Sequence, residues 1–395
     1  MLNFYLNACG ITCALGDGHE QVKARLYAAQ SGVAATTRWS AGRELPLGEV
    51  PAMLPSVAHL PPPQRSRNNA LALAALAQIR PAVAAAIARY GAHRIGVVIG
   101  TSTSGIGETE RAIAHHAADG ALPPDFHYGV QEMGSPAEML AQQLGLGGPA
   151  YVHSSACSSS AKAMASAARL IRMGLCDAVL TGGVDSLCAF TVAGFAALES
   201  VSAARCNPMS ANRKGINIGE GAALFLMSSE GRSQVKLMGW GESSDGHHMS
   251  APDPAGVGAE QAMTLALQRA GLAVAQIDYI NMHGTATPQN DAMESRVIAR
   301  LFGAEVPVSS TKPFTGHTLG AAAAIEAALC WLAMQDDNPR GKLPPHLWDG
   351  AHDPLLPVLN LVPAGAALGR PLRYVLSSSF AFGGSNAALV LGREA

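Results

Sequence analysis

One structural plan occurs twice in this sequence, and it constrains the fold more than any other feature. A short run of apolar and β-branched residues leads into a Ser- and Gly-rich turn with a reactive side chain, and a helix-forming stretch of small residues follows. The two copies are AYVHSSACSSSAKAMASAARLI, which carries Cys157, and VPVSSTKPFTGHTLGAAAAIEAALCWL, which carries His317. We therefore expect two halves of similar design.

Further strand-like segments flank both copies. RIGVVIG and DAVLTGGVDS accompany the first, whereas DYINMHGTATP, the helix NDAMESRVIARLF and a last strand YVLSSSFAFGGSNAALVL accompany the second. Strands that alternate with helices are typical of a layered α/β fold. We predict an N-terminal half of residues 1–230, which carries the reactive Cys, and a C-terminal half of residues 231–395, which carries two reactive-type His.

Two segments do not fit this pattern. AARCNPMSANRKGIN is polar, irregular and basic, so we expect an excursion between the halves. DDNPRGKLPPHLWDGAHDPLLP is rich in Pro and Gly, which indicates a surface loop.

Composition limits the possible partners. Hydrophobic residues make up 48% of the 395 residues and charged residues only 14%. So few charges on a large chain predict that apolar surface is hidden, for example at a subunit interface. The formal charge of -2 provides no global basic field for nucleic acid.

Targeting and redox signals point to the cytoplasm. The N-terminal segment lacks a basic region ahead of its apolar residues, so we expect no secretory signal. The most apolar helical stretch is interrupted by Arg80 and Pro81, so we expect no integral membrane segment. Seven scattered cysteines form neither a disulfide framework nor a paired zinc motif, which favours a reducing cytosol.

Cys157 is the cysteine whose surroundings favour chemistry. It lies between a predicted strand and a predicted helix, where the helix dipole and unpaired N–H groups favour the nucleophilic thiolate. Five neighbouring serines suit a turn open to a large substrate. An isolated cysteine is more often simply buried, and we interpret the other six in this way.

Two histidines stand at comparable places. His283 directly follows a predicted strand and His317 directly precedes a predicted helix. A lone histidine is usually a packed or surface residue, but nearby glycines permit close backbone approach here. Lys312 and Glu326 are placed to form a buried pair that orients the site.

These residues suit two kinds of chemistry. Cys157, His283 and His317 would supply three zinc ligands, but a fourth is not evident and the spacing is not that of a structural zinc site, so we predict no metal. The alternative is thioester chemistry. A thiolate accepts an acyl group, and two imidazoles stabilise charge on the carbonyl oxygen of a second thioester.

The segment SSSFAFGGSN places two aromatic residues beside two glycines. The glycines are ordinary turn residues, but Phe380 and Phe382 are notable in a chain with 5% aromatic residues. We expect these rings to line or gate a substrate channel. A backbone N–H of this turn is also placed to complete an oxyanion hole with the N–H of Cys157.

Taken together, the motifs resemble the elongating β-ketoacyl-acyl carrier protein synthases of the thiolase-like superfamily. The ordered set is GTSTSG, SSACSSSAKA, GGVDS, GFAALESVS, GEGAALFL, HGTATPQND, TKPFTGHTLGAA and FAFGGSN, and it covers nearly the whole chain. The resemblance implies a five-layered αβαβα fold of two pseudo-repeated halves, usually dimeric. It also implies an acyltransferase that forms carbon–carbon bonds.

The resemblance assigns roles residue by residue. Cys157 would accept the acyl chain, while His283 and His317 would bind the malonyl thioester and promote its decarboxylation. Lys312 and Glu326 would form the pair behind them. The pantetheine arm would contact Thr285 and Thr287, and the N–H groups of Cys157 and Phe382 would form the oxyanion hole.

Two features separate this chain from other members of the superfamily. Thiolases carry a second reactive Cys where this chain has FAFGGSN, and initiating ketosynthases carry Asn in place of His317. Cys157 with two histidines therefore indicates decarboxylative elongation. Chain-length-factor partners lack the Cys, so Cys157 also favours the catalytic member over its non-catalytic partner.

Other positions depart from the family pattern. KGINIGEG has Lys214 and Ile216 where an acidic residue and Phe are usual, so the acyl pocket is expected to differ at Ile216. Thr103 replaces a bulkier apolar residue, which predicts a roomier or more polar tunnel. RSRNNALALAALAQI, GTSTSG and CNPMSANRKGINIGEGAAL are most similar to the ketosynthases of aryl polyene biosynthesis, which act with a catalytically silent homologue.

The resulting hypothesis is condensation of an acyl thioester with malonyl-acyl carrier protein, in fatty-acid or polyene-type synthesis. Substrates would arrive on the phosphopantetheine arm of acyl carrier protein, and no other cofactor is expected. The enzyme would be a homodimer or a heterodimer with a chain-length-factor-like homologue. A non-catalytic partner subunit and a Cys-dependent acyl hydrolase remain the alternatives.

A local basic patch is expected to receive the acidic carrier protein. The candidate residues for this patch are Arg65, Arg67, Arg205, Arg213 and Lys214. The simpler interpretation is that they are solvated surface charges without a docking role.

Overall fold

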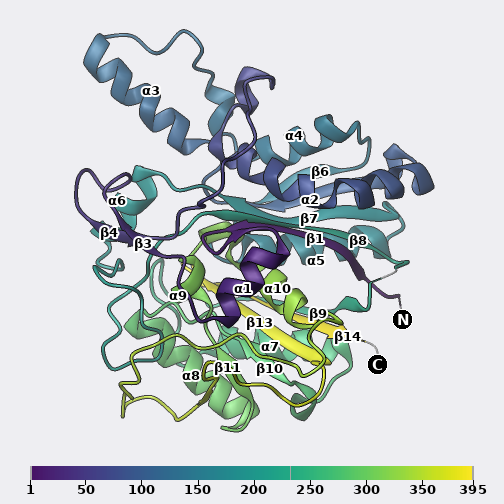
Figure 1. Cartoon of the computed structure of the whole chain (residues 1–395), viewed down its shortest axis with the longest axis vertical. Helices are drawn as coiled ribbons and strands as arrows, with labels where there is room; N and C mark the ends of the chain where they lie inside the picture. The colour runs from purple at the N-terminus through teal and green to yellow at the C-terminus, as the bar shows by residue number, and fades with distance from the viewer. Residues whose placement is uncertain (1, 232, 394–395) are drawn as a thin grey trace.

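The computed structural model describes residues 2–231 and 233–393, which form five alternating layers of helices and strands (Figure 1). The outer limits of the two predicted halves, residues 1 and 395, lie outside this range. The layered α/β architecture with two pseudo-repeated halves is confirmed.

The first half contains the strands β1 (Tyr5–Cys13), β2 (Gly16–Asp17), β3 (Ala34–Thr36), β4 (Leu45–Leu47), β5 (Ile95–Gly100), β6 (Ala150–His153), β7 (Ala178–Asp185) and β8 (Gly221–Ser228). Its helices are α1 (His19–Tyr27), α2 (Arg67–Tyr90), α3 (Ile106–Asp119), α4 (Ser135–Leu144), α5 (Ser159–Arg172) and α6 (Ala189–Ala197).

The second half contains the strands β9 (Val235–Ser244), β10 (Tyr279–Asn281), β11 (Pro307–Ser309), β12 (Asn360–Leu361), β13 (Tyr374–Ala381) and β14 (Ser385–Arg393). Its helices are α7 (Val257–Ala270), α8 (Pro288–Phe302), α9 (Lys312–Thr315) and α10 (Ala322–Ala333). Short 3-10 helices cover Pro62–Gln64, Ala92–Arg94, Tyr128–Gln131, Val274–Gln276 and Leu319–Ala321.

Strand order shows the internal repeat directly. The first half is ordered β1-β8-β7-β5-β6, and the second half β9-β14-β13-β10-β11, which is the same order by position along each half. The pattern of parallel and antiparallel pairs is also the same. In the main sheet the two halves are joined by the antiparallel pairing of β1 with β9, where Tyr5 lies opposite Lys236.

The middle layer explains the abundance of small residues. Helices α5 and α10 pack on each other and lie between the two sets of strands. Every residue of α10 is buried, and ten of the 14 residues of α5 are buried, five of them alanines. A helix covered on both faces has room for few large side chains, so Ala dominates these segments.

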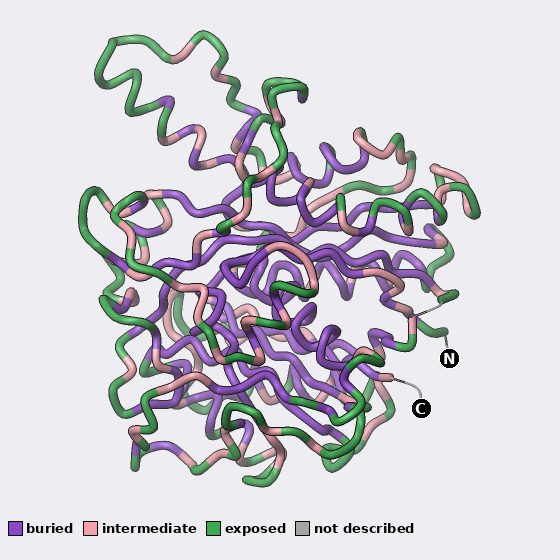
Figure 2. The backbone as a smooth tube through the Cα atoms, in the orientation of Figure 1, coloured by how far each residue is buried: buried purple, intermediate pink, exposed green. Residues whose placement is uncertain are grey.

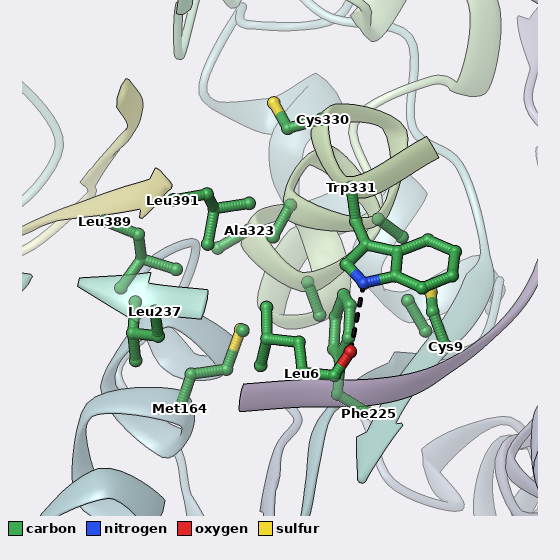
Figure 3. Packing of buried hydrophobic residues seen from close by; sticks show 14 of the residues in the cluster. Leu6, Cys9, Met164, Phe225, Leu237, Ala323, Cys330, Trp331, Leu389 and Leu391 are labelled. Atoms are coloured by element: carbon green, nitrogen blue, oxygen red, sulfur yellow. Dashed lines mark hydrogen bonds between the residues drawn. The ribbon is translucent and has the colours of Figure 1, made fainter. Parts of the chain in front are cut away.

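The central core joins both halves (Figure 3). Leu6 of β1, Met164 of α5, Leu237 of β9 and Leu391 of β14 belong to one cluster of buried side chains. The indole N–H of Trp331 in α10 donates to the Leu6 carbonyl oxygen, 3.1 Å away. The halves therefore share one core and fix the loops at their junction relative to each other.

Two predicted elements differ in the structure. The last strand is two strands, β13 and β14, because Gly383 and Gly384 adopt φ values of 82° and 74° and turn the chain back. Helix α2 continues through Pro81 instead of ending there. Among the described residues, α2 is the helix long and apolar enough to cross a membrane, and packing of its apolar face against β1, β7 and β8 accounts for that composition.

The Pro-rich segment is more buried than a surface loop. His346 accepts the N–H of Ser310 at Nδ1 and lies 3.0 Å from the Pro208 carbonyl oxygen at Nε2. It thereby connects the end of β11 to the irregular excursion of residues 203–217. Figure 2 shows that the strands and the inner helices are buried, whereas α3 and the segment after it are largely exposed.

Candidate active site

Cys157 lies in the turn between β6 and α5. The preceding residue, Ala156, has φ 49°, a left-handed conformation that a non-glycine residue adopts only at a cost. Ser158 and Ser159 donate their N–H groups to the carbonyl oxygens of Ser155 and Ala156, so the turn is tightly closed. The thiol therefore has a fixed position and is only 5% exposed.

His317 is held against this thiol from the second half. Its Nε2 is 2.9 Å from Cys157 Sγ, within hydrogen-bonding distance. Its backbone N–H donates to the Asn217 carbonyl oxygen at 2.6 Å, and its carbonyl oxygen accepts the N–H of Gly219. The excursion before β8 therefore positions His317, a link between segments distant in sequence.

His283 completes the group from the end of β10. Its backbone N–H donates to Glu294 Oε1 at 2.7 Å, and the N–H of Gly284 donates to Glu294 Oε2 at the same distance. The His283 and His317 rings lie edge to face, with centroids 5.3 Å apart. One side-chain nitrogen or sulfur atom from each of Cys157, His283 and His317 lies within 4.8 Å of the others.

The surroundings keep both imidazoles neutral. Burial lowers the pKa of His283 and His317 well below the ordinary value, and the nearby positive charge of Lys312 lowers both further. Lys312 itself forms a fully buried ion pair with Glu326. The predicted pair therefore exists, and its ammonium disfavours imidazolium at the site.

Cys157 differs from the expectation based on its helix position. Burial raises the pKa of its thiol to about 12, although Lys312 and the N–H groups of Phe382 and Cys157 itself favour the thiolate. The backbone N–H groups act in the predicted direction, but desolvation outweighs them and the net shift of the pKa is upward. The resting pair is a neutral thiol beside a neutral imidazole.

The same N–H groups lie where an oxyanion hole is required. Phe382 is in the tight turn between β13 and β14, and its N–H, like that of Cys157, is close enough to favour negative charge at Sγ. Two backbone donors from opposite halves thus converge at the nucleophile.

A narrow cavity opens on these groups. Beyond the three reactive residues it is lined by the predicted Ile216, Thr285, Thr287, Phe380 and Phe382, and by Phe195, Pro252, Asn290 and Ala381. Phe195 and Asn290 were not singled out from the sequence. Both could have been found because they belong to the motifs GFAALESVS and HGTATPQND. Pro252 comes from an irregular loop and carries no such signal.

Thr103 lies outside the lining of this cavity. Its Oγ1 donates to Asp185 at 2.9 Å. The buried Asp185 carboxylate also accepts the hydroxyls of Thr101 and Ser102 and the N–H of Gly320, at 2.5 to 2.6 Å. Asp185 therefore connects the turn after β5 to the loop after His317, and a role of Thr103 in an acyl tunnel stays a prediction.

The three reactive side chains fit a hydrogen-bonded group better than a metal site. Ligands of a tetrahedral zinc ion with Zn–S of about 2.3 Å and Zn–N of about 2.0 Å would be about 3.5 Å apart. Cys157 Sγ and His317 Nε2 are closer than that. Within residues 2–231 and 233–393, no fourth His, Cys, Asp or Glu ligand joins the group.

The predicted basic residues separate into two groups. Arg67 donates from Nε and Nη2 to the buried Glu220, and Arg213 forms a largely buried ion pair with Asp353 at 2.5 Å. Both guanidinium groups are thus occupied inside the fold. The other three predicted docking residues, Arg65, Arg205 and Lys214, are exposed.

Comparison with known proteins gives consistent matches. The N-terminal domain of β-ketoacyl synthases matches residues 7–231, and the C-terminal domain matches residues 235–347. Nodulation protein E of Rhizobium meliloti is 36% identical over 310 residues, 75% of each chain. The 3-oxoacyl-acyl-carrier-protein synthase 2 of the same organism is 38% identical over 267 residues, 63% of this chain and 62% of that protein.

A solved structure matches over the whole fold. The ketosynthase ApeO of Xenorhabdus doucetiae, determined in complex with its chain length factor ApeC, is 44% identical. The TM-score is 0.94, and the match covers 100% of this chain and 98% of that chain.

Proposed function

The chain belongs to the β-ketoacyl synthase family, and on that premise we propose that it catalyses the decarboxylative Claisen condensation of an acyl thioester with malonyl-acyl carrier protein. One observation carries this proposal: Cys157, His283 and His317 meet in a single buried cavity beside two backbone N–H donors. The same observation disfavours a non-catalytic partner subunit, which would not need the nucleophile.

Acyl transfer to Cys157 is the first step. As Sγ attacks the carbonyl carbon of the acyl thioester, the thiol proton passes to His317 Nε2, 2.9 Å away. Negative charge on the carbonyl oxygen is stabilised by the N–H groups of Cys157 and Phe382. The carbon–sulfur bond to the carrier then breaks, and the carrier thiolate leaves with the proton from His317.

Condensation follows when the malonyl thioester enters. Neutral imidazoles of His283 and His317 donate hydrogen bonds to its thioester oxygen, and the bond to the carboxylate breaks to release carbon dioxide and an enolate. The enolate carbon attacks the carbonyl carbon of the acyl-Cys157 thioester. Cys157 leaves as a thiolate and takes up a proton from solvent, and the β-ketoacyl chain remains on the carrier protein.

The residues along the cavity suit delivery on a pantetheine arm. Thr285 and Thr287 line the cavity, and their hydroxyls are 3.0 Å apart. Hydroxyls in an otherwise apolar opening provide hydrogen bonds for the amides of such an arm. Decarboxylation supplies the carbanion, so we propose that the reaction requires no metal or redox cofactor, and chelator treatment should leave turnover unchanged.

The direct test is Cys157→Ala, with Cys176→Ala as the matched control at the other end of α5. Wild-type enzyme is incubated with acylated carrier protein, and the protein mass is measured before and after addition of malonyl-carrier protein. We expect an acyl adduct on wild type and on Cys176→Ala, its absence in Cys157→Ala, and a product two carbons longer than the acyl substrate. Free acid without consumption of malonyl thioester would instead identify an acyl hydrolase.

We further propose an aryl polyene substrate and a cytoplasmic, reducing setting. The motifs GTSTSG and CNPMSANRKGINIGEGAAL support a role in aryl polyene synthesis. The 44% identity to the ketosynthase ApeO over the whole chain agrees with a closely related role. A reducing setting keeps the Cys157 nucleophile as a free thiol. Product masses from reactions with aryl-primed and saturated acyl carriers would separate the two substrate classes.

A second ketosynthase-fold chain is the proposed subunit partner. Helix α3 and the segment after it project from the layered body (Figures 1 and 2). The side chains of Ile113, Leu122 and Tyr128 in this region are exposed. ApeO is found with a chain length factor, which supports a partner of that type. Light scattering of wild type and of the double variant Ile113→Asp, Tyr128→Asp should show loss of association in the variant.

A further inference from the structure

Side chains from the start of the nucleophile helix contact the end of the turn that carries the Phe382 N–H. Ser385, the first residue of β14, follows the two-glycine turn directly. Its Oγ accepts a hydrogen bond from Lys162 Nζ at 2.5 Å and lies 2.9 Å from Ser158 Oγ. Two polar groups from the other half of the chain therefore meet at the end of this turn.

Both groups belong to the start of α5. Ser158 directly follows Cys157, and Lys162 lies four residues further on, so both face the same side of the helix. Ser158 Oγ also donates to the Ser155 carbonyl oxygen at 2.9 Å, inside the nucleophile turn. A continuous set of hydrogen bonds thus runs from that turn through Ser158 and Ser385 to Lys162.

The other charged groups near Lys162 do not compete with Ser385 for its ammonium group. Glu242 of β9 is the neighbouring carboxylate, and it forms an ion pair with Arg169 of α5. His153 of β6 also lies close and is half-buried. Partial burial lowers the pKa of Lys162, while Glu242 opposes this shift. The ammonium is therefore directed to a neutral hydroxyl, in an environment where charged hydrogen bonds are strong.

We propose that Lys162 and Ser385 are positioning residues that hold the Phe382 N–H in place for acyl transfer to Cys157. This inference rests on the proposed condensing activity. Lys162 and Ser385 do not touch the reacting atoms and would act only through the turn. Gly383 and Gly384 give the turn conformational freedom. Backbone hydrogen bonds of Gly383 with Met249 and of Gly384 with Ala381 restrict it, and the Lys162–Ser385 contact adds a side-chain restraint at the end of the turn. A displaced donor stabilises the oxyanion less, which slows the chemical step without weakening substrate binding.

The test compares Lys162→Met, Lys162→Arg, Ser385→Ala and the double variant Lys162→Met, Ser385→Ala. Ser166→Ala is the matched control, because this hydroxyl lies on the same helix but bonds to Tyr151 at 2.7 Å, away from the turn. Single-turnover acylation of Cys157 is measured by mass spectrometry over a range of acyl-carrier protein concentrations. Thermal midpoints are recorded for every variant.

We expect Lys162→Met to acylate about tenfold more slowly, which is about 1.4 kcal/mol in the barrier, with half-saturation unchanged within about twofold. Lys162→Arg should recover most of the rate, since it restores a charged donor. The double variant should be no slower than Ser385→Ala, because Lys162 acts through Ser385. Ser166→Ala should match wild type.

Several outcomes would overturn the inference. These are a Lys162→Met rate within about twofold of wild type, independent effects that multiply in the double variant, or a change confined to half-saturation. If Lys162→Met does not fold, Ser385→Ala carries the same prediction alone. Failure of wild type itself to acylate would refute the proposed function, whereas normal wild-type acylation with unaffected variants would refute only the positioning role.

Discussion

The proton between Cys157 and His317 determines how the nucleophile is activated. A helix N-terminus alone would favour a thiolate, but the side chain is buried and the pKa of its thiol is raised to about 12. With the His317 pKa also lowered, the resting pair is neutral and the proton must move during attack. We therefore expect the thiol of Cys157 to be a weak nucleophile at neutral pH.

Alkylation with iodoacetamide tests this resting state. We expect slow modification of Cys157 at pH 7 and a rate that keeps rising beyond pH 9, because the thiolate fraction increases up to the raised pKa. A small cysteine peptide, with a pKa of about 8.5, serves as the reference and should level off earlier. A rate for Cys157 that is constant between pH 6 and pH 9 would instead indicate a thiolate–imidazolium pair.

Removal of the Lys312–Glu326 pair should alter the pH dependence of Cys157 acylation, the step in which His317 must be neutral to accept the thiol proton. Lys312 lowers the pKa of both His283 and His317, so its loss raises them and protonates the imidazoles at higher pH. In the double variant Lys312→Met, Glu326→Gln, the acid limb of the rate profile should therefore move to higher pH. The second substitution avoids an unpaired buried carboxylate.

A matched control is available on the surface. Lys23 forms an exposed ion pair with Asp337, and the variant Lys23→Met, Asp337→Asn should leave the profile unchanged. An unshifted acid limb in the buried variant would mean that Lys312 does not set the charge state of the histidines.

At the scale of elements, glycines allow the outer helices to approach the strands closely. A Cβ added at Gly10 of β1 would lie 2.1 Å from the Ala75 carbonyl oxygen of α2. The equivalent contact in the second half is between Gly241 of β9 and the Ala262 carbonyl oxygen of α7, at 1.7 Å. In both halves, therefore, a glycine on the first strand lets the outer helix pack closely against the sheet. This agrees with the repeat seen in strand order.

Gly241→Ala should destabilise the protein by about 2 to 3 kcal/mol, because backbone atoms of α7 would have to move. Gly194→Ala is the control, since no atom lies within 4 Å of a Cβ built on this helical residue. Urea unfolding followed by circular dichroism measures both. Equal stability of the two variants would show that the contact between β9 and α7 relaxes freely.

The elements themselves were largely evident from sequence pattern. The strands before Cys157 and His317, and the small-residue helices after them, lie where periodicity and turn residues indicate. The hairpin of β13 and β14 was predicted as one strand, because both arms are apolar and only the φ values of Gly383 and Gly384 distinguish a turn from a flexible strand. Helix α2 passes through Pro81, since its packing against the sheet outweighs the loss of one backbone hydrogen bond.

At the scale of the whole molecule, burial decides which basic residues face a partner. Arg67 and Arg213 neutralise carboxylates inside the fold, whereas Arg205 and Lys214 are exposed on the excursion whose Ile216 lines the cavity. Docking of an acidic carrier protein should therefore depend on exposed residues such as Arg205 and Lys214.

Charge reversal tests this docking surface. Arg205→Glu with Lys214→Glu should raise KM for malonyl-carrier protein about tenfold or more, and the wild-type KM should rise with salt. KM for a small malonyl thioester should not change. Arg80→Glu, an exposed position on α2, is the control. An unchanged KM for the carrier-bound substrate would place docking elsewhere.

By itself, the sequence determined the repeated plan, the reactive residues and the family, because these depend on residue type and local order. Only the tertiary structure decided the charge states of Cys157, His283 and His317, the internal pairing of Arg67 and Arg213, and the contact of Lys162 with Ser385. Each of these depends on burial or on the distance between groups far apart in the chain. Desolvation and electrostatic energies are set by those distances, which sequence order does not contain.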